Sequence, residues 1–584
     1  QHPDLFREEN QWQVTQSLLS LFDELSLNQK DLFTSEDNWK QRLNKAYGIA
    51  DEEQKRYEHL LYEDRMFYTI WHAWNVKLDE NRLYDETSEL LSQLSNAAGT
   101  INSNQHFIFL GTEYYSNAEL DFIDYLANKN QCRILDYETT LGNSNHQHAF
   151  ADFIKEAFKQ ASAEQPHASI KQRALEYAAK YSGSSREELP LSVFLASSEE
   201  QQIRAIDYYI RLNILNGKNK IAVISEDRKL SRRLRALLER ANIQLQDNAG
   251  WSLATTQAAS IIERWLECIE EDFSAYPLLD CLKSPYIDIT KAVLGKNAGK
   301  EDFRKNIYRF EHDLVFHENI SSNIERYKSG LRARLKRLSH WPPGCGNDLV
   351  NTLDFIKDTA ESLSELYFSS SADNKKIQLS DFLDALIDSL AQLGVTQGYQ
   401  EDEAGLILLN TFDELKQSLS CVDPALSWHD CRTWLGMALE SQHFTPSTNT
   451  SVVQLMTLEQ SSHLDFDCLV IAAVEPQHYP GCAKASPFFN QAVRASLGLK
   501  TWEEQRRLRQ ELFNRALLCA PDVLLTACNE ENGEEKPVSA WLELLISFHE
   551  LSYGKEPEGE SLINNVLHDI VNSKNEVFNC DEIG

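Results

Sequence analysis

Several features are missing from this 584-residue chain, and each absence excludes a class of protein. No apolar run approaches the roughly eighteen residues that a membrane-spanning helix requires, and no basic-plus-apolar signal segment opens the chain. The eleven cysteines show no Cys-x-x-Cys pair and no histidine spacing that suits zinc. We therefore expect a cytoplasmic protein with reduced cysteines, no membrane contact and no metal ligand. Cys580 is the one thiol that could join a site completed by residues outside this chain.

Positive charge is scarce. The chain has 57 Lys and Arg against 89 Asp and Glu, which gives a formal net charge of −32 at pH 7. Phosphate binding needs local positive charge, so this balance argues against a protein that coats nucleic acid along its whole surface. It still permits a confined basic groove, and it suits a subunit of a large assembly.

A phosphate-cradling loop is also missing, because the pattern Gly-x-x-x-x-Gly-Lys-Ser/Thr does not occur. Such a loop needs its backbone N–H groups at a helix start, and a lysine alone does not suffice. The Gly-Lys pairs that begin at Gly217, Gly295, Gly299 and Gly554 lack the preceding glycine, the following hydroxyl, or both. We expect no ATP hydrolysis by this chain as given, and the sequence assigns it no catalytic residue.

Two short apolar stretches, 452–457 and 468–473, organise what is present. They lie in a chain that is otherwise rich in helix signals, which predicts neighbouring strands of a covered, mostly parallel sheet. The polar loop between them would follow the end of a strand, where such sheets bind ligands.

The same periodicities predict an α/β protein built from four segments. Residues 1–185 form helices and a short strand-helix-strand part, 186–273 begin a second α/β domain, 274–440 are a helical insertion, and 441–584 return to the second domain. One sheet would then be built from two separated parts of the chain.

A recognisable pattern surrounds the loop after 457. Met456-Thr457-Leu458 ends the first strand, Leu464-Asp465-Phe466 precedes the second, and Tyr479-Pro480 follows it. The pattern resembles motif V of the UvrD-like superfamily 1 DNA helicases. That family has His, Lys and Gly where this chain has Glu459, Ser462 and His463, and those positions handle DNA backbone and nucleotide in active helicases. The resemblance implies that this chain keeps the strands and loop of the motif and lacks the residues that contact DNA and nucleotide.

Two further stretches extend the resemblance. One of them is similar to the start of domain 2A of the same helicases. It comprises Glu199-Glu200 and the strand 220–224, with Glu226 shortly after it. There the family places an arginine that meets ATP phosphate, and the carboxylate of Glu226 would instead repel it. Residues 504–508 and 514–516 resemble motif VI, with Arg515 on the arginine that bridges to the γ-phosphate.

Three segments outside the helicase motifs indicate a more specific family. Pro537-Val538-Ser539-Ala540-Trp541-Leu542, Ser486-Pro487-Phe488-Phe489 and Leu497-Gly498-Leu499 resemble segments of AddB-type proteins, the inactivated-helicase subunits of bacterial AddAB helicase–nucleases. The resemblance covers most of the chain and is strongest over 190–250 and 451–545.

This resemblance implies RecA-like, P-loop NTPase-type helicase domains with large helical insertions, the first domain being incomplete. It implies a DNA-binding or DNA-guiding role in double-strand-break repair and recombination, with DNA and an AddA-type helicase subunit as partners. The chain begins at Gln1 and ends at Gly584, so we expect a piece of a longer protein. This piece would be non-catalytic. An exonuclease site of the PD-(D/E)XK type would lie beyond Gly584, and Mg²⁺ and ATP are left to the full-length protein or its partner.

The candidate site residues are these. Thr457 and Arg515 are degenerate nucleotide- or phosphate-binding residues, and the DNA-binding candidates are Arg232, Arg233, Arg332, Arg334, Lys336 and Arg337. For Arg515 the alternative is a structural arginine bonded to carboxylates. For the basic clusters it is a solvated face paired with Asp and Glu. Trp341, beside the second cluster, either stacks a base or packs in the core.

Two other functions stay open at this point. One is an active superfamily 1 ATP-dependent DNA helicase whose P-loop lies outside this chain. The other is a protein-binding scaffold without DNA contact, which the net charge of −32 favours.

Overall fold

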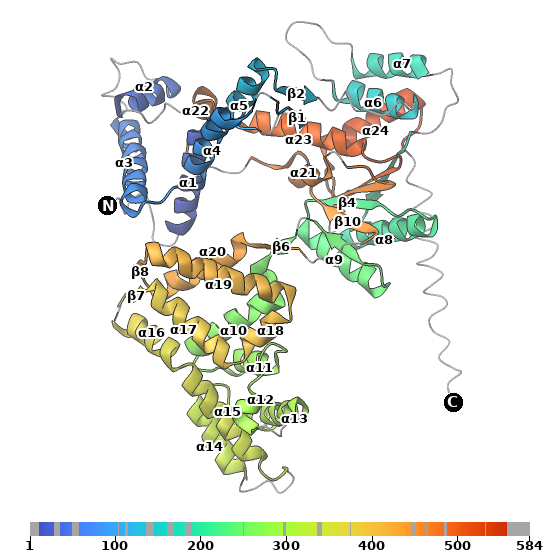
Figure 1. Ribbon diagram of the computed structural model, residues 1–584. Coiled ribbons are helices and arrows are strands. Elements are labelled where there is room, and N and C mark those ends of the chain that lie inside the picture. The colour runs from blue at the N-terminus through green and yellow to red at the C-terminus, as the bar shows by residue number, and fades with distance from the viewer. Residues whose placement is uncertain are drawn as a thin grey trace, which may run out of the picture. The chain divides into compact units, whose positions relative to one another are not determined.

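The computed structural model describes most of the chain (Figure 1). The described ranges are 11–28, 36–48, 58–102, 104–110, 115–135, 145–159, 169–181, 189–248, 250–295, 299–335, 341–373, 375–445, 451–462, 464–483, 488–531 and 533–557. The chain divides into a sheet unit, Gln1–Asn248 with Asn449–Gly584, and a helical unit, Ala249–Thr448. Each unit is described by itself below.

A six-stranded sheet forms the centre of the sheet unit, and every pairing in it is parallel. In sheet order the strands are β3 (Leu191–Ala196), β12 (Val523–Cys528), β11 (Cys468–Ala472), β4 (Ile221–Ser225), β10 (Val453–Met456) and β5 (Leu245–Asp247). The prediction of a parallel sheet built from two separated segments is confirmed. The prediction that 452–457 and 468–473 are neighbours is wrong, because β4 lies between β10 and β11 and pairs with both.

Helices cover both faces of this sheet, which explains why its central strands are apolar throughout. Successive residues of a strand point to opposite faces. In β4, Ile221 and Val223 pack toward α8 (Glu199–Leu215) and α9 (Arg228–Arg240), while Ala222 and Ile224 pack toward the other helices. Those other helices are α6 (Asn145–Phe158), α7 (Ile170–Tyr181), α21 (Leu458–Ser461), α23 (Trp502–Leu517) and α24 (Ala540–Tyr553). The sheet unit therefore has a three-layer α/β/α core.

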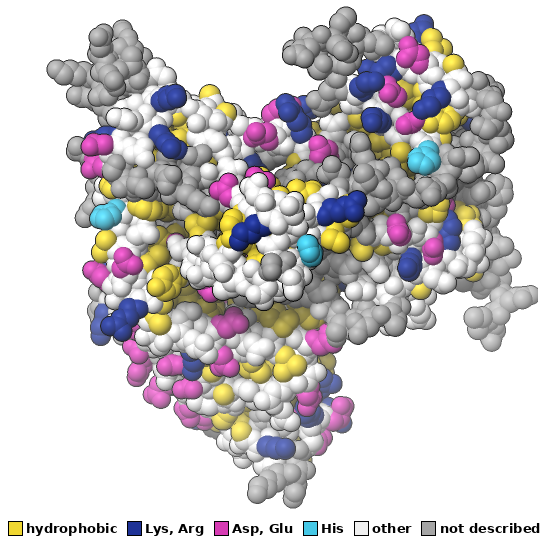
Figure 2. Space-filling view, turned by 45° about the horizontal axis from the view of Figure 1, so that its top comes forward, with side chains coloured by type: hydrophobic (Ala, Val, Ile, Leu, Met, Phe, Trp, Pro, Cys, Tyr) yellow, Lys and Arg dark blue, Asp and Glu magenta, His cyan; other side chains and the backbone are white. Residues whose placement is uncertain are grey.

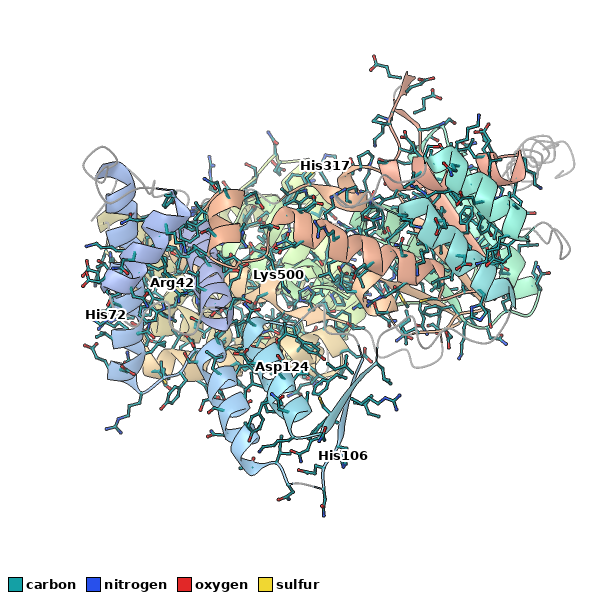
Figure 3. All side chains as sticks on the ribbon, turned by 90° about the horizontal axis from the view of Figure 1, so that it is seen from above. Arg42, His72, His106, Asp124, His317 and Lys500 are labelled. Atoms are coloured by element: carbon teal, nitrogen blue, oxygen red, sulfur yellow. The ribbon has the colours of Figure 1, made fainter. Side chains whose placement is uncertain are left out.

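The start of the chain forms a smaller part of the sheet unit. Its helices are α1 (Gln11–Asn28), α2 (Glu36–Ala46), α3 (Glu58–Asn81), α4 (Glu86–Thr100) and α5 (Asn117–Asn128), and its parallel strands are β1 (Phe107–Leu110) and β2 (Cys132–Leu135). The predicted strand-helix-strand arrangement is confirmed. Figure 3 labels Asp124 on α5 and His106 just before β1.

The stretch before α23 holds these first helices in place. Phe488 and Phe489 each lie 5.2 Å, ring centroid to ring centroid, from Phe67 of α3. Arg494, in α22 (Gln491–Ser496), donates to both carboxylate oxygens of Glu24, at 2.6 and 2.8 Å. The same guanidinium donates to the carbonyl of Lys500, the residue labelled in Figure 3. Residues more than 400 positions apart thus share one core.

The helical unit packs its helices around one large apolar core. They are α10 (Gln257–Glu270), α11 (Ala275–Lys283), α12 (Thr290–Leu294), α13 (Lys300–Phe310), α14 (Ile324–Leu335), α15 (Cys345–Thr359), α16 (Glu361–Asp373), α17 (Leu379–Gln392), α18 (Val395–Gln400), α19 (Glu403–Cys421) and α20 (Trp428–Ser441), with the π-helix η5 (Glu311–Phe316). The sequence placed the start of the insertion at 274. In the structure α10 belongs to the helical unit, because the indole of Trp265 is buried in its core and donates to Ser389.

The chain enters and leaves the helical unit at one point. There β6 (Trp251–Ser252) pairs antiparallel with β9 (His443–Phe444). Gly250 has a φ of +62°, and a Cβ at this position would lie 2.8 Å from the carbonyl oxygen of Phe444. Only glycine tolerates both that dihedral and that approach. A second short ladder joins β7 (Ile377–Gln378) to β8 (Ala425–Leu426).

Candidate functional site

Six parallel strands end at one edge of the sheet, the carboxyl edge, and polar residues follow each of them. They are Ser198 after β3, Glu226 after β4, Asn248 after β5, Thr457 after β10, Glu475 after β11 and Asn529 after β12. Open α/β sheets bind ligands along this edge. It is therefore the candidate site, and its charges decide what it can hold.

The end of the central strand β4 carries an ion pair. Arg509 of α23 places its Nη2 3.3 Å from Oε2 of Glu226, and the two side chains are only 28% and 22% exposed. The other carboxylate oxygen, Oε1, and the Nε of Arg509 are buried and have no hydrogen-bond partner among the described residues. A carboxylate thus lies where the sequence resemblance expects a phosphate-binding arginine, and it is already neutralised.

The phenol of Tyr479 lies near enough to this ion pair to feel both charges. It lies in the turn η6 (Gln477–Gly481), is fully buried, and packs its ring 5.7 Å from that of Phe513. Its hydroxyl also has no partner among the described residues. Burial raises the pKa of this phenol well above its ordinary value, and the negative charges of Glu226 and Glu459 raise it further. Tyr479 is therefore a neutral phenol beside the Glu226–Arg509 pair.

The neighbouring strand β11 is followed by a second buried carboxylate. Glu475 is 4% exposed and accepts from Nζ of Lys536 at 2.7 Å. Its other oxygen accepts from the backbone N–H of Cys528 at 3.3 Å. Lys536 comes just after the hairpin of β13 (Glu530–Glu531) and β14 (Glu534–Glu535). Both central strands thus end near a glutamate whose charge is balanced by a basic residue from later in the chain.

Thr457 serves as a helix cap. Its hydroxyl accepts from the backbone N–H of Gln460 at 3.4 Å, and the Gln460 side chain accepts from the backbone N–H of Thr457 at 3.1 Å. This reciprocal pair is the capping box that begins α21. The Gln460 amide also donates to the carbonyl of Asn248 at 2.8 Å, which ties the ends of β10 and β5 together. A phosphate-binding role of Thr457 stays a prediction.

Arg515 lies half-buried in the last turn of α23, the helix that packs on α21. Its carbonyl accepts from the backbone N–H of Leu518 and from Sγ of Cys519. The arginine that meets Glu226 is Arg509, six residues earlier. Arg509 was not among the residues predicted from the sequence. Its spacing offered a signal, because it lies four residues before the buried Phe513 and both fall on one face of the helix.

Arg232 and Arg233 lie on α9, where acidic partners surround the basic side chains. Arg233 is bidentate with Glu200, at 3.0 and 3.2 Å, while Arg232 is exposed and donates to a backbone carbonyl of its own helix. The hydrogen bond from Arg233 lowers the pKa of Glu200, which keeps this carboxylate charged. Lys229 pairs with Glu199 at 2.7 Å. On the face in Figure 2, Lys and Arg side chains lie scattered among Asp and Glu side chains.

In the second basic cluster, on α14, Arg332 is exposed and Arg334 is not. The Arg334 side chain is 15% exposed, donates to Glu318 at 2.9 Å, and reaches the carboxylate of Asp313 at 3.7 Å. Lys336 and Arg337 lie outside the described residues. Trp341 is buried and donates to Asp313 at 2.7 Å, so the interpretation as a core tryptophan is confirmed. DNA contact by the arginines stays a prediction.

Comparison with known proteins gives no family for this chain. No protein-family model matches it, and no curated protein matches it either. Over the described residues, none of the helices combines the length and the apolar character needed to cross a bilayer. The carboxyl edge, with two paired carboxylates and a buried phenol, is poorly suited to hold a polyphosphate, because each carboxylate repels phosphate oxygens.

Proposed function

We propose that this chain is the helicase-like, ATPase-inactive core of an AddB-type subunit of a bacterial helicase–nuclease. In this proposal the sheet unit contains a RecA-like domain, and the helical unit is the insertion that such helicases carry. The subunit binds or guides DNA during double-strand-break repair, beside an AddA-type motor. Mg²⁺ and ATP serve the motor and a nuclease domain outside this chain.

The ion pair between Glu226 and Arg509 carries the proposal. An ATP-binding helicase needs a free cation at the end of β4, and here the strand is followed by a carboxylate that binds the nearby guanidinium. A triphosphate would have to break this pair and then lie beside an exposed negative charge. At about 4 Å and an effective dielectric constant near 20, two such charges repel by about 4 kcal/mol.

The chain path supports the same proposal. The sheet begins with β3, β4 and β5, is interrupted by the 200-residue helical unit Ala249–Thr448, and resumes with β10, which pairs with both β4 and β5. An insertion between strands of one parallel sheet is what the helicase resemblance implies. Parallel sheets of this kind also serve many unrelated functions, so the strand order adds weight only together with the residues at the carboxyl edge.

A nucleotide titration tests the inactive-core part of the proposal. We expect a fluorescent ATP analogue with Mg²⁺ to show no saturable binding to the chain up to millimolar concentration, and we expect no ATP hydrolysis. Saturable binding at micromolar analogue would overturn this part and favour an active helicase.

A DNA titration tests the guiding part. Fluorescence anisotropy of a forked DNA, measured at several salt concentrations, should show binding that weakens steeply with salt. Because the Arg334 side chain is only 15% exposed, the informative variant is Arg332→Glu combined with Arg232→Glu, which changes two exposed cations. Each lost phosphate contact should lower the salt slope by about 0.7 to 0.9. Lys416→Glu combined with Lys77→Glu is the control with the same change in net charge, because these lysines, on α19 and α3, pair with Asp384 and Glu80.

The scaffold alternative has its own support, since Arg233, Arg334 and Lys229 are all neutralised by acidic partners. Absence of DNA binding by the unmutated chain, even at low salt, would refute the guiding role and favour a protein-binding scaffold. Binding that the double arginine variant and the double lysine control weaken equally would show general electrostatic attraction without a groove on α9 or α14.

A further inference from the structure

A π-helical turn in the helical unit brings two histidines together. In η5 the backbone N–H of His317 donates to the carbonyl of His312 at 3.2 Å, five residues back. On an α-helix, residues five apart point about 140° away from each other. The wider π-turn places them on one side, with ring centroids 4.7 Å apart and planes inclined by 77°. Such turns are rare and often mark functional positions.

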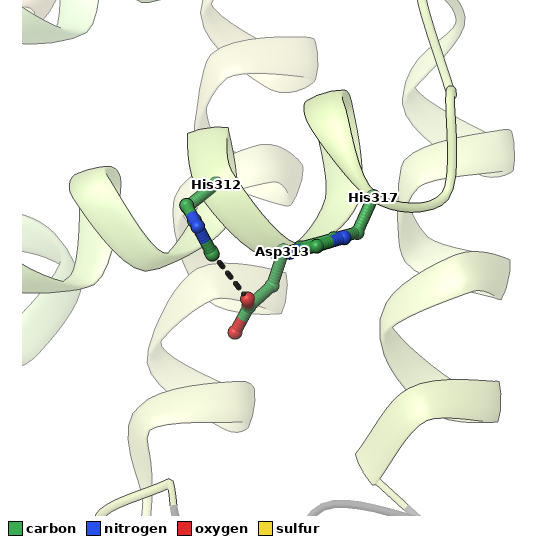
Figure 4. Close-up of side chains that lie close together, drawn as sticks. All are labelled: His312, Asp313 and His317. Carbon is green, nitrogen blue, oxygen red and sulfur yellow. Dashed lines mark hydrogen bonds and ion pairs between the residues drawn. The ribbon is translucent and has the colours of Figure 1, made fainter.

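A buried carboxylate lies beside the two rings, next to His312 (Figure 4). Oδ1 of Asp313 is 2.9 Å from Nδ1 of His312, and Oδ2 accepts from the indole of Trp341 at 2.7 Å. Asp313 is 8% exposed, whereas both histidines are exposed. One ligand atom from each of the three residues lies within 4.8 Å of the others. Trp341 thus holds one oxygen of the carboxylate, and the two exposed imidazoles can rotate toward the other oxygen.

From this geometry we infer that His312, Asp313 and His317 form a binding site for a zinc ion. Imidazole and carboxylate together suit zinc and its neighbours among the divalent transition metals. Zinc bonds of about 2.1 Å require ligand atoms roughly 3 to 3.5 Å apart. The ligand atoms here lie within 4.8 Å of one another, so the side chains must close by up to about 2 Å. The exposed imidazoles can do this by rotation, and water completes the fourth position.

The charges around the site permit a cation. Among the described residues, Arg334 places its guanidinium 3.7 Å from the carboxylate of Asp313, and it is also bound to Glu318 at 2.9 Å. Glu311, at the start of the same turn, pairs with Lys283. Within the part of the chain that the structure describes, the acidic and basic side chains near Asp313 therefore roughly balance, and the carboxylate remains available as an acceptor. A hydrogen bond from Trp341 and the ion pair with Arg334 hold the carboxylate of Asp313 as outer partners hold ligand carboxylates in known metal sites.

A bound zinc ion would cross-link the side chains of the π-turn and stiffen the connection from α13 to α14. This consequence concerns the stability of the helical unit and does not depend on the function proposed above. No metal ligand was predicted from the sequence, because histidines five residues apart point to different sides of an α-helix.

The test counts zinc bound to the full chain by equilibrium dialysis in the presence of a reducing agent. The variants are His312→Gln and His317→Gln, and the control is His429→Gln, an exposed histidine on α20 of the same unit. We expect each of the two variants to lose one zinc equivalent, or to bind it about 10- to 100-fold more weakly, while the control binds as the unmutated chain does. With cobalt in place of zinc, the unmutated chain should show a visible absorption band and no thiolate charge-transfer band. The two variants should lose the visible band.

Folding of the variants is checked first, by circular dichroism and thermal melting with a chelator, where all three should match the unmutated chain. A second readout is the zinc-induced rise in melting temperature, which should vanish in His312→Gln and His317→Gln only. Equal zinc stoichiometry and affinity in all four proteins would overturn the inference, because the zinc would then be bound elsewhere. So would the absence of any zinc binding by the unmutated chain at micromolar concentration.

Discussion

Replacing Arg509 by methionine removes the cation from the candidate site and keeps most of the side-chain volume. Glu226 then stays at the end of β4 with one oxygen already buried and unpartnered among the described residues. The second change, Glu226→Gln, removes the opposite charge. The double variant removes both. Together they form a double-mutant cycle across the ion pair.

The exposure of the two side chains sets the expected magnitude. Breaking a fully buried pair costs about 3 to 5 kcal/mol, and an exposed pair contributes about 1 kcal/mol or less. The pair here is roughly one-quarter exposed and 3.3 Å apart, so it lies between these limits. We expect Arg509→Met to lose about 2 kcal/mol of local stability and Glu226→Gln to lose about 1 kcal/mol. The loss in the double variant should be at least about 1 kcal/mol smaller than the sum of the two single losses.

Hydrogen exchange followed by mass spectrometry is the suitable assay. The chain has two units, so a single unfolding transition would not report on the sheet unit alone. Peptides that contain β4 and β11 report its local opening free energy. A loss of 2 kcal/mol corresponds to about 30-fold faster exchange, since each 1.4 kcal/mol is a factor of ten. Arg506→Met is the control, because Arg506 pairs with Glu503 on a more exposed face of the same helix.

Two results would refute this reasoning. One is unchanged exchange of the β4 peptide in Arg509→Met, which would mean that the pair does not stabilise the carboxyl edge. The other is a double variant whose loss equals the sum of the single losses, which would mean that the two side chains do not interact. A control that slows or speeds exchange as much as Arg509→Met would also remove the claim that this position is special.

The remaining predictions concern the helical unit. Gly250→Ala should destabilise it by about 1 to 3 kcal/mol, because a Cβ would lie 2.8 Å from a backbone carbonyl of β9 at a φ of +62°, and exchange of the β6 and β9 peptides should rise. Ser389→Ala removes the acceptor of the buried Trp265 indole, 2.9 Å away, and should cost about 1 to 3 kcal/mol, measured by hydrogen exchange of the α10 and α17 peptides. Burial raises the pKa of Cys431 to about 12, so at pH 8 iodoacetamide should modify the exposed Cys421 in the native chain and reach Cys431 only after unfolding, as peptide mass spectrometry can show.

Each of these has a matched control and a contradicting result. Gly436→Ala lies inside α20 with open space around its Cβ and should be neutral or stabilising; equal losses at both glycines would contradict the argument from φ and close approach. Ser418→Ala, on the exposed part of α19, should change stability by less than about 0.5 kcal/mol, and a similar change in Ser389→Ala would contradict the indole argument. Modification of Cys431 at the rate of Cys421 in the folded chain would show that its thiol is not buried.

Much of the fold followed from local patterns. The apolar stretches 220–224, 452–457 and 468–473 all proved to be strands of the sheet. Patterns of period two or 3.6 suffice for this, because they record which side of an element meets the core. The helical character of the insertion followed for the same reason.

The partners within the candidate site did not follow. Which strand lies between β10 and β11, and which arginine meets Glu226, depend on how segments about 230 to 280 residues apart pack together. A sequence pattern gives the type of each element and leaves its neighbours open, because pairing in a parallel sheet is chosen by helix crossovers and shared burial.

The sequence by itself determined that strands alternate with helices, that positive charge is scarce and that no phosphate-cradling loop is present. Only the tertiary structure decided what the charged residues do. Arg334 is turned inward to Asp313 and Glu318, Glu226 is matched by Arg509, and a π-turn aligns two histidines that an α-helix would separate. The reason is physical: a charge or a ring acquires its role from the few atoms within about 4 Å of it, and the backbone fold brings those atoms there from distant parts of the chain.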